Sequence, residues 1–267
     1  MNPYKYNERK YAEKILKEGF LTNYYIYELK LVAKFYKKIG CKPKDRKELL
    51  YKFCEKHMEN FNRVRFYKTI NSILRFASKK TSKIIEIDKI PVYDEEVDYI
   101  NNLDLNYHYK KVLFALLVQN KINKEIAEIL YNNPSQYNFF GGSKKHFTEI
   151  KEMAKIPTKY NINKIIHHFS NEGLVEVRTR GKINLLFVED IPQGEEVVME
   201  ITTYDNVGYY FDWYNGDKKI AECVECGKLI KLTSNRKKYC EECWREKQLK
   251  WQRESMRKSR NVDKNVK

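Results

Sequence analysis

The sequence reads CVECGK at residues 223–228 and CEECW at residues 240–244, two CxxC pairs with thirteen residues between them. Such a spacing is typical of a metal site, because a structural Zn²⁺ takes four ligands in a tetrahedron and each pair supplies two thiolates from one tight turn. Gly227 follows the first pair, where the backbone turns sharply. We therefore predict a structural Zn²⁺ bound by Cys223, Cys226, Cys240 and Cys243.

Disulfide bonds and a catalytic ion are the alternatives for these cysteines. The sequence shows no secretory signal, and the remaining cysteines, Cys41 and Cys54, stand alone in helical sequence, which disfavours an oxidising compartment. Four thiolates also close the coordination shell and leave no position for a reactive water. The sequence thus favours a structural metal ion. It also favours a cytoplasmic, intracellular location for the protein.

The residues around the two pairs predict a small module with a basic helix. Residues 229–232 and 236–239 can form a hairpin around residues 233–235, and strong helix formers follow from Arg245. A knuckle, a hairpin and a helix that starts at the second pair resemble a treble-clef zinc finger. The resemblance is to four-cysteine fingers with a basic helix on proteins of low-GC bacterial phages and mobile elements. It covers the last fifth of the chain, and it implies zinc while leaving DNA, RNA or protein open as partner.

Charge distribution is the next informative property. The 267 residues carry a formal net charge of +16, which favours an anionic partner such as nucleic acid. The codon usage of an AT-rich genome also enriches lysine, but it would spread the excess evenly. The net charge is instead +13 over residues 1–90, −6 over 91–217 and +9 over 218–267, which favours a functional role for the two basic ends. No apolar run reaches the length of a membrane span, and no small-molecule substrate is evident.

Apolar residues at spacings of three and four predict a helical N-terminal part. Helices are expected over residues 11–39, from an N-cap at Asp45 onward, and over 64–76. Their basic faces fit a phosphate-binding surface and an ordinary solvated surface equally well. Residues 84–92 alternate as in a short strand, and the acidic cluster at 94–98 favours a helix N-terminus. A Mg²⁺ or acid–base site is the alternative for that cluster.

The middle of the chain predicts several further helices. A buried helix is expected over 110–118 and another over 122–131, ended by Asn132, Asn133 and Pro134, with a loop at Gly141–Gly142. A helix over 147–156 and a turn with Asn161 as cap precede an apolar stripe at Ile162, Ile165, Ile166 and Phe169. Strands over 174–178 and 183–189, joined at Gly181, complete the pattern.

Helix, turn, helix and hairpin resemble a winged helix-turn-helix. The resemblance implies that the second helix enters the major groove of duplex DNA and that the wing contacts its backbone. The implied recognition residues are Lys159, Lys164, His167, His168 and Asn171, and those of the wing are Arg178, Arg180 and Lys182. Residues 144–188 hold nine basic and four acidic residues inside the acidic middle of the chain. The basic residues of the zinc module are expected to bind nucleic acid as well: Arg236, Lys237, Lys238, Arg245, Lys250, Arg253, Arg257, Lys258 and Arg260.

Two segments near the C-terminus complete the prediction. Residues 196–203 and the aromatic stretch 207–214 are expected as strands around a turn at 205–206. The aromatic side chains could stack bases, but three flanking aspartates favour a core role. The final basic helix has no continuous apolar stripe, so we expect it to fold on nucleic acid and to give way to disorder from about Asn261.

Together these patterns predict a mainly α protein with small β elements. The expected parts are a basic helical domain (1–90), a winged helix-turn-helix-like domain (91–190), a β segment (191–217) and a zinc finger with basic helix (218–267). The favoured function is a non-enzymatic, zinc-containing, duplex-DNA-binding protein, a transcription regulator or replication-associated factor of a phage or mobile element. The alternatives are an adaptor that docks on replication or transcription machinery, and a metal-dependent nucleic-acid enzyme that uses the 94–98 cluster or Glu195 and Glu196.

Overall fold

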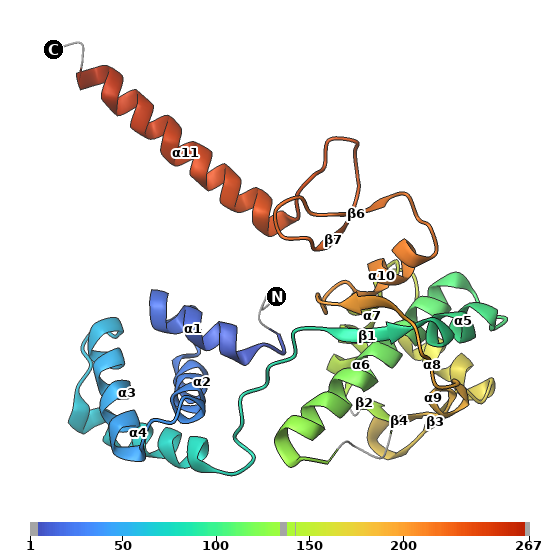
Figure 1. Ribbon diagram of the computed structural model, residues 1–267, viewed down its shortest axis with the longest axis horizontal. Coiled ribbons are helices and arrows are strands. Elements are labelled where there is room, and N and C mark those ends of the chain that lie inside the picture. The colour runs from blue at the N-terminus through green and yellow to red at the C-terminus, as the bar shows by residue number, and fades with distance from the viewer. Residues whose placement is uncertain (1–4, 134–137, 142, 265–267) are drawn as a thin grey trace. The chain divides into compact units, whose positions relative to one another are not determined.

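The computed structural model describes residues 5–133, 138–141 and 143–264, with Arg180 and residues 257–264 described by their backbone alone. The described chain is mainly helical with small sheets, which confirms the predicted class (Figure 1). It divides into two compact units, Met1–Ile90 with Gln119–Asn138, and Pro91–Val118 with Phe139–Lys267. The four-domain organisation stays a prediction. Pro134 and Gly142, predicted as a helix stop and a loop residue, lie outside the described residues.

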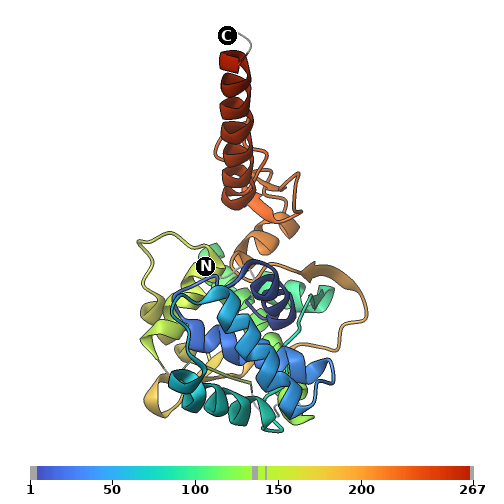
Figure 2. The same ribbon diagram turned by 90° about the vertical axis from the view of Figure 1, so that its left-hand side faces the viewer.

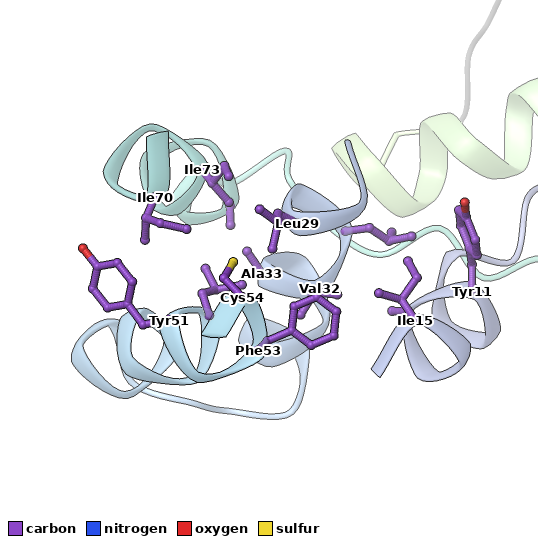
Figure 3. Close-up of a cluster of buried hydrophobic side chains, with 14 of the residues drawn as sticks. Tyr11, Ile15, Leu29, Val32, Ala33, Tyr51, Phe53, Cys54, Ile70 and Ile73 are labelled. Atoms are coloured by element: carbon purple, nitrogen blue, oxygen red, sulfur yellow. The ribbon is translucent and has the colours of Figure 1, made fainter. Parts of the chain in front are cut away.

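Four amphipathic helices build the core of the first unit. They are α1 (Glu8–Glu18), α2 (Tyr25–Lys38), α3 (Pro43–His57) and α4 (Arg63–Ser78), and Figure 2 shows them from the side that faces left in Figure 1. Every helix contributes buried side chains to one cluster, among them Ile15, Val32, Phe53 and Ile70 (Figure 3). Burial of such side chains is the main stabilising contribution, at about 1.5–3 kcal/mol each.

The predicted helix over 11–39 is wrong, because α1 and α2 are separate helices. Gly19 ends α1 with φ of +91°, and its N–H donates to the carbonyl of Ile15 at 2.8 Å. The buried carboxylate of Glu28 then accepts hydrogen bonds from the Leu21 N–H at 3.0 Å and the Thr22 hydroxyl at 2.8 Å, which fixes the turn. The next helix also differs from its prediction, since it starts with Pro43 in its first turn and has Lys42, not Asp45, as N-cap.

The segment after α4 holds less strand than predicted. Residues 90–93 alone form β1 (Ile90–Tyr93), which pairs with β5 (Val197–Ile201). The acidic cluster opens α5 (Asp94–Asn102), where Glu96 accepts the Tyr93 N–H at 2.9 Å and Asp94 accepts the Glu95 N–H at 2.9 Å. The interpretation of this cluster as a helix N-terminus is confirmed.

One long helix, α6 (Tyr107–Tyr131), replaces the two helices predicted over 110–118 and 122–131. The intervening residues, Gln119, Asn120 and Lys121, include neither glycine nor proline, so nothing interrupts the backbone hydrogen bonds between the two apolar stretches. Residues 107–118 of α6 belong to the second unit, and the rest belong to the first.

A three-stranded antiparallel sheet with two helices forms one part of the second unit. Its elements are β2 (Phe139–Gly141), α7 (Lys144–Ala154), α8 (Ile162–Asn171), β3 (Val175–Val177) and β4 (Lys182–Leu185), and the strand order is β2-β4-β3. The predicted helices, the Asn161 cap and the turn at Gly181 are confirmed. The second strand ends at Leu185 instead of 189, because α9 (Phe187–Asp190) follows it. The sequence did not predict β2.

The aromatic stretch at 207–214 is a helix, α10 (Val207–Tyr214), and not the predicted strand. Its buried residues, Val207, Tyr210 and Phe211, recur at helical spacing and pack as core, while Trp213 stays 48% exposed. Aromatic residues favour strands in general, but close packing decides here, since a Cβ on Gly208 would lie 2.0 Å from the Ala154 carbonyl oxygen. The core interpretation of this stretch is therefore confirmed for its buried residues.

Candidate metal centre

A hairpin positions the first cysteine pair. Strands β6 (Ile220–Glu222) and β7 (Leu229–Lys231) are antiparallel, and Cys223 and Cys226 lie in the turn between them. Gly227 has φ of +70°, and its N–H donates to the Cys223 carbonyl at 2.8 Å. The predicted hairpin between 229–232 and 236–239 is wrong, because the knuckle folds β7 directly back onto β6. Residues 234–237 form a turn of their own instead, with the Lys237 N–H on the Ser234 carbonyl.

The long helix α11 (Glu241–Lys264) positions the second pair. It begins directly after Cys240, so that Cys243 lies in its first turn. The four sulfur atoms all lie within 4.8 Å of one another, and three of the four residues, Cys223, Cys240 and Cys243, are buried. No disulfide joins them. The predicted cluster is confirmed as a group positioned to bind a metal ion.

Backbone groups prepare at least one sulfur for ionisation. Burial alone would raise the pKa of the Cys223 thiol, but N–H groups that point at its sulfur, that of Cys240 at 3.3 Å first among them, outweigh burial and lower this pKa to about 6. Burial raises the pKa of Cys226 and Cys243. A bound cation would supply the positive charge that lets all four thiols ionise together.

As far as its side chains are described, to Met256, helix α11 has almost no packing partner beyond its first turn. Every side chain from Trp244 to Met256 is exposed except that of Lys247, which is partly buried. The Lys247 ammonium lies 2.9 Å from a Glu225 carboxylate oxygen and donates to the Tyr239 hydroxyl at 3.3 Å. The helix continues to Lys264, past Asn261, where the ordered chain was expected to end. Both views show it as one continuous helix (Figures 1 and 2).

The predicted recognition residues lie on and before α8. Lys159, Lys164, His167 and Asn171 are exposed. His168 is only partly exposed, because its ring packs edge to face against Tyr109 of α6 with ring centroids 5.3 Å apart. In the hairpin, Lys182 is exposed, whereas Arg178 already pairs with Glu176 at 2.8 Å and lies over the Phe139 ring at 5.0 Å. The Arg180 side chain lies outside the described residues.

The remaining predicted basic residues belong to the metal module. Arg236 and Lys238 are exposed and Lys237 is partly buried, all in the loop before Cys240, and Arg245, Lys250 and Arg253 are exposed on α11. The side chains of Arg257, Lys258 and Arg260 lie outside the described residues.

Two features of the second unit were not predicted from the sequence. A cleft of about 220 Å³ adjoins Cys240, and its lining includes the four lysines Lys155, Lys228, Lys231 and Lys237 together with Asp205, Glu241 and Glu242. Lys111 and Asp212 form a buried ion pair between α6 and α10. Both features join residues far apart in the chain, and no local pattern marks them.

Among the described helices, none combines the length and the apolar character needed to cross a bilayer. Comparisons of the chain with protein-family models, with curated proteins and with solved structures found no match.

Proposed function

We propose that this protein is a zinc-containing DNA-binding protein, a transcription regulator or replication-associated factor, with α8 and the β3–β4 hairpin on duplex DNA and the metal module adding affinity for phosphates. The origin in a phage or mobile element rests on the resemblance of the metal module. Catalysis is not part of the proposal, since the acidic residues at 94–96 serve the start of α5.

The surface of α8 is the observation that carries the proposal. Its apolar stripe, Ile162, Ile165, Ile166 and Phe169, is buried to 9% exposure or less. Its opposite face leaves Lys164, His167 and Asn171 exposed, and residues 162–171 include no acidic side chain. A helix that is anchored on one side and polar to basic on the other suits insertion into a groove lined by phosphates.

The order of elements supports a winged helix-turn-helix. Helices α7 and α8 are followed directly by the β3–β4 hairpin. Between the end of α6 and the start of α7 the chain forms β2. This strand pairs with β4, and Phe140 lies opposite Ile183. The chain between α6 and α7 thus contributes a third strand to the sheet of the β3–β4 hairpin.

The sulfur geometry supports zinc. Zn–S bonds of about 2.3 Å in a tetrahedron place neighbouring sulfurs about 3.8 Å apart; the Cys226 and Cys240 sulfurs are 3.8 Å apart, and all four sulfurs lie within 4.8 Å of one another. Four thiolates suit Zn²⁺ or iron. We favour Zn²⁺ because it has no redox chemistry and so requires no electron donor or acceptor. The ion would join the knuckle of the hairpin to the first turn of α11, so its role would be structural.

Binding of a labelled duplex across a salt series tests the proposal. We expect the logarithm of the affinity to fall linearly with the logarithm of the salt concentration. Replacing Lys164, His167 and Asn171 together by alanine should weaken binding at least tenfold, about 1.4 kcal/mol. Lys145→Ala is the matched control, because this exposed lysine of α7 belongs to the same unit but lies outside α8, the β3–β4 hairpin and the metal module. A triple variant that binds like the control, or a flat salt response, would contradict DNA binding, and a stable protein partner would then favour the adaptor.

A further inference from the structure

Three aromatic rings lie in a row at the start of α11. Tyr239 stacks on Trp244 with ring centroids 6.3 Å apart and an interplanar angle of 21°. Trp244 meets Trp251, two turns further along the helix, edge to face at 5.6 Å and 85°. We call Tyr239, Trp244 and Trp251 the aromatic strip.

The aromatic strip is attached to the metal cluster but is not a core. Tyr239 packs against the cluster of cysteines and neighbours Cys240, and Trp244 neighbours Cys243. Trp244 and Trp251 are nevertheless 43% and 52% exposed. Large apolar rings gathered on an exposed surface usually mark a binding surface, so the metal cluster would hold these rings in place for a partner.

The charges around the aromatic strip indicate the chemistry of that partner. The exposed Arg236 and Lys238 precede Tyr239 in the same loop, and the Lys247 ammonium lies 4.4 Å from the centre of the Tyr239 ring. Residues 218–267 carry a net charge of +9. A partner that offers negative charge and flat rings together is nucleic acid with unpaired bases, because a duplex keeps its base faces inside the stack.

We propose that the aromatic strip binds single-stranded nucleic acid by stacking unpaired bases on Trp244 and Trp251, with phosphates on Arg236 and Lys238. This inference rests on the proposed function, since it assumes a protein that binds nucleic acid, and it assigns single strands to a surface separate from α8.

A second copy of the chain fits this surface less well. Among the described side chains of α11, those up to Met256, the other exposed apolar residues are Leu249 and Met256, and they lie roughly 120–140° around the helix from Trp244, at 3.6 residues per turn. The part of α11 whose side chains are described therefore lacks the single apolar stripe of a helix pair, and pairing two copies would bring their basic residues together.

Tryptophan fluorescence tests the inference. The chain has three tryptophans, so a Trp213→Phe background leaves Trp244 and Trp251 as the reporters. We titrate the zinc-loaded protein with oligo-dT, with oligo-U and with a blunt DNA duplex of equal length. The single strands should quench the emission and the duplex should not, and the two single strands distinguish DNA from RNA.

Substitutions on α11 give the matched comparison. Trp251→Ala should weaken single-strand binding roughly five- to hundredfold, the range found for one base stacked on a ring, and Trp251→Phe should recover part of it. Met256→Ala removes an equally exposed apolar side chain from another side of the same helix and should leave binding unchanged.

The outcomes separate this inference from the proposed function. Duplex binding that depends on α8, without quenching by single strands, would overturn the aromatic strip alone. Absence of binding to every nucleic acid would overturn both. Self-association of the wild-type protein in sedimentation, abolished in Trp251→Ala, would assign the aromatic strip to a second copy and also overturn the inference.

Discussion

Lys111 and Asp212 form an ion pair inside the second unit, with the ammonium nitrogen 2.7 Å from one carboxylate oxygen and the side chains 5% and 6% exposed. The other carboxylate oxygen accepts the Tyr107 hydroxyl at 2.8 Å. These bonds join α6 to α10, and α10 packs in turn against β6 and β7 of the metal module. The pair thus connects the sheet-bearing part of the unit to the hairpin that carries Cys223.

Removal of one partner of this pair should destabilise the fold. Asp212→Ala leaves the Lys111 ammonium buried without a counter-charge, which costs about 3–5 kcal/mol. Urea denaturation measures the change in the free energy of unfolding. The double variant Lys111→Met with Asp212→Leu removes both charges and should be markedly more stable than Asp212→Ala. Equal stability of the two variants would mean that the ion pair does not hold α10.

Removal of the metal should unfold the metal module selectively. A strong chelator should reduce the helical circular dichroism by the contribution of α11, because an isolated helix with no packed face is marginal in water. Mass spectrometry under native conditions should find one zinc per chain and none in Cys240→Ser. Cys41→Ser, which alters a cysteine of the first unit, should keep the zinc. Equal zinc content in Cys240→Ser and wild type would contradict the assignment of the ligands.

Stability should fall on mild acidification because of His108. Burial lowers the pKa of this imidazole from its ordinary value of 6.5, and its Nδ1 is buried without a partner. Below about pH 6.5 the unfolded chain therefore binds a proton that the folded chain resists, so the free energy of unfolding falls as the pH drops towards the folded pKa. His108→Gln should show a smaller loss between pH 7 and pH 5.5. Equal losses would exclude His108 as the source.

A side chain at position 208 should separate α10 from α7. In Gly208→Ala the new Cβ would lie 2.0 Å from the Ala154 carbonyl oxygen and 2.5 Å from its carbon. Since both atoms are backbone, one of the helices must move, and we expect a loss of about 1–3 kcal/mol, measured by thermal unfolding. An unchanged midpoint would show that the two helices can shift without cost.

The sequence predicted features that depend on nearby residues. The cysteine cluster follows from ligand type and spacing, and α8 follows from four apolar residues at helical intervals. Strand β2 was missed because its partner β4 lies about 40 residues further along the chain. Lys111 and Asp212 each look like solvated charges until two distant helices meet. Helix α10 was predicted as a strand because aromatic content favours β structure, whereas packing against α7 decides the conformation.

The sparse attachment of α11 has a mechanical consequence. A helix of 24 residues is about 36 Å long at 1.5 Å per residue, and its first turn alone is fastened to the sulfur cluster. Because the helix is this long, a tilt of about 10° at the cysteines would displace its far end by roughly 6 Å. Small adjustments at the cysteines would thereby be magnified along the helix and, in the proposed nucleic-acid-binding role, would let its basic side chains reach a larger volume.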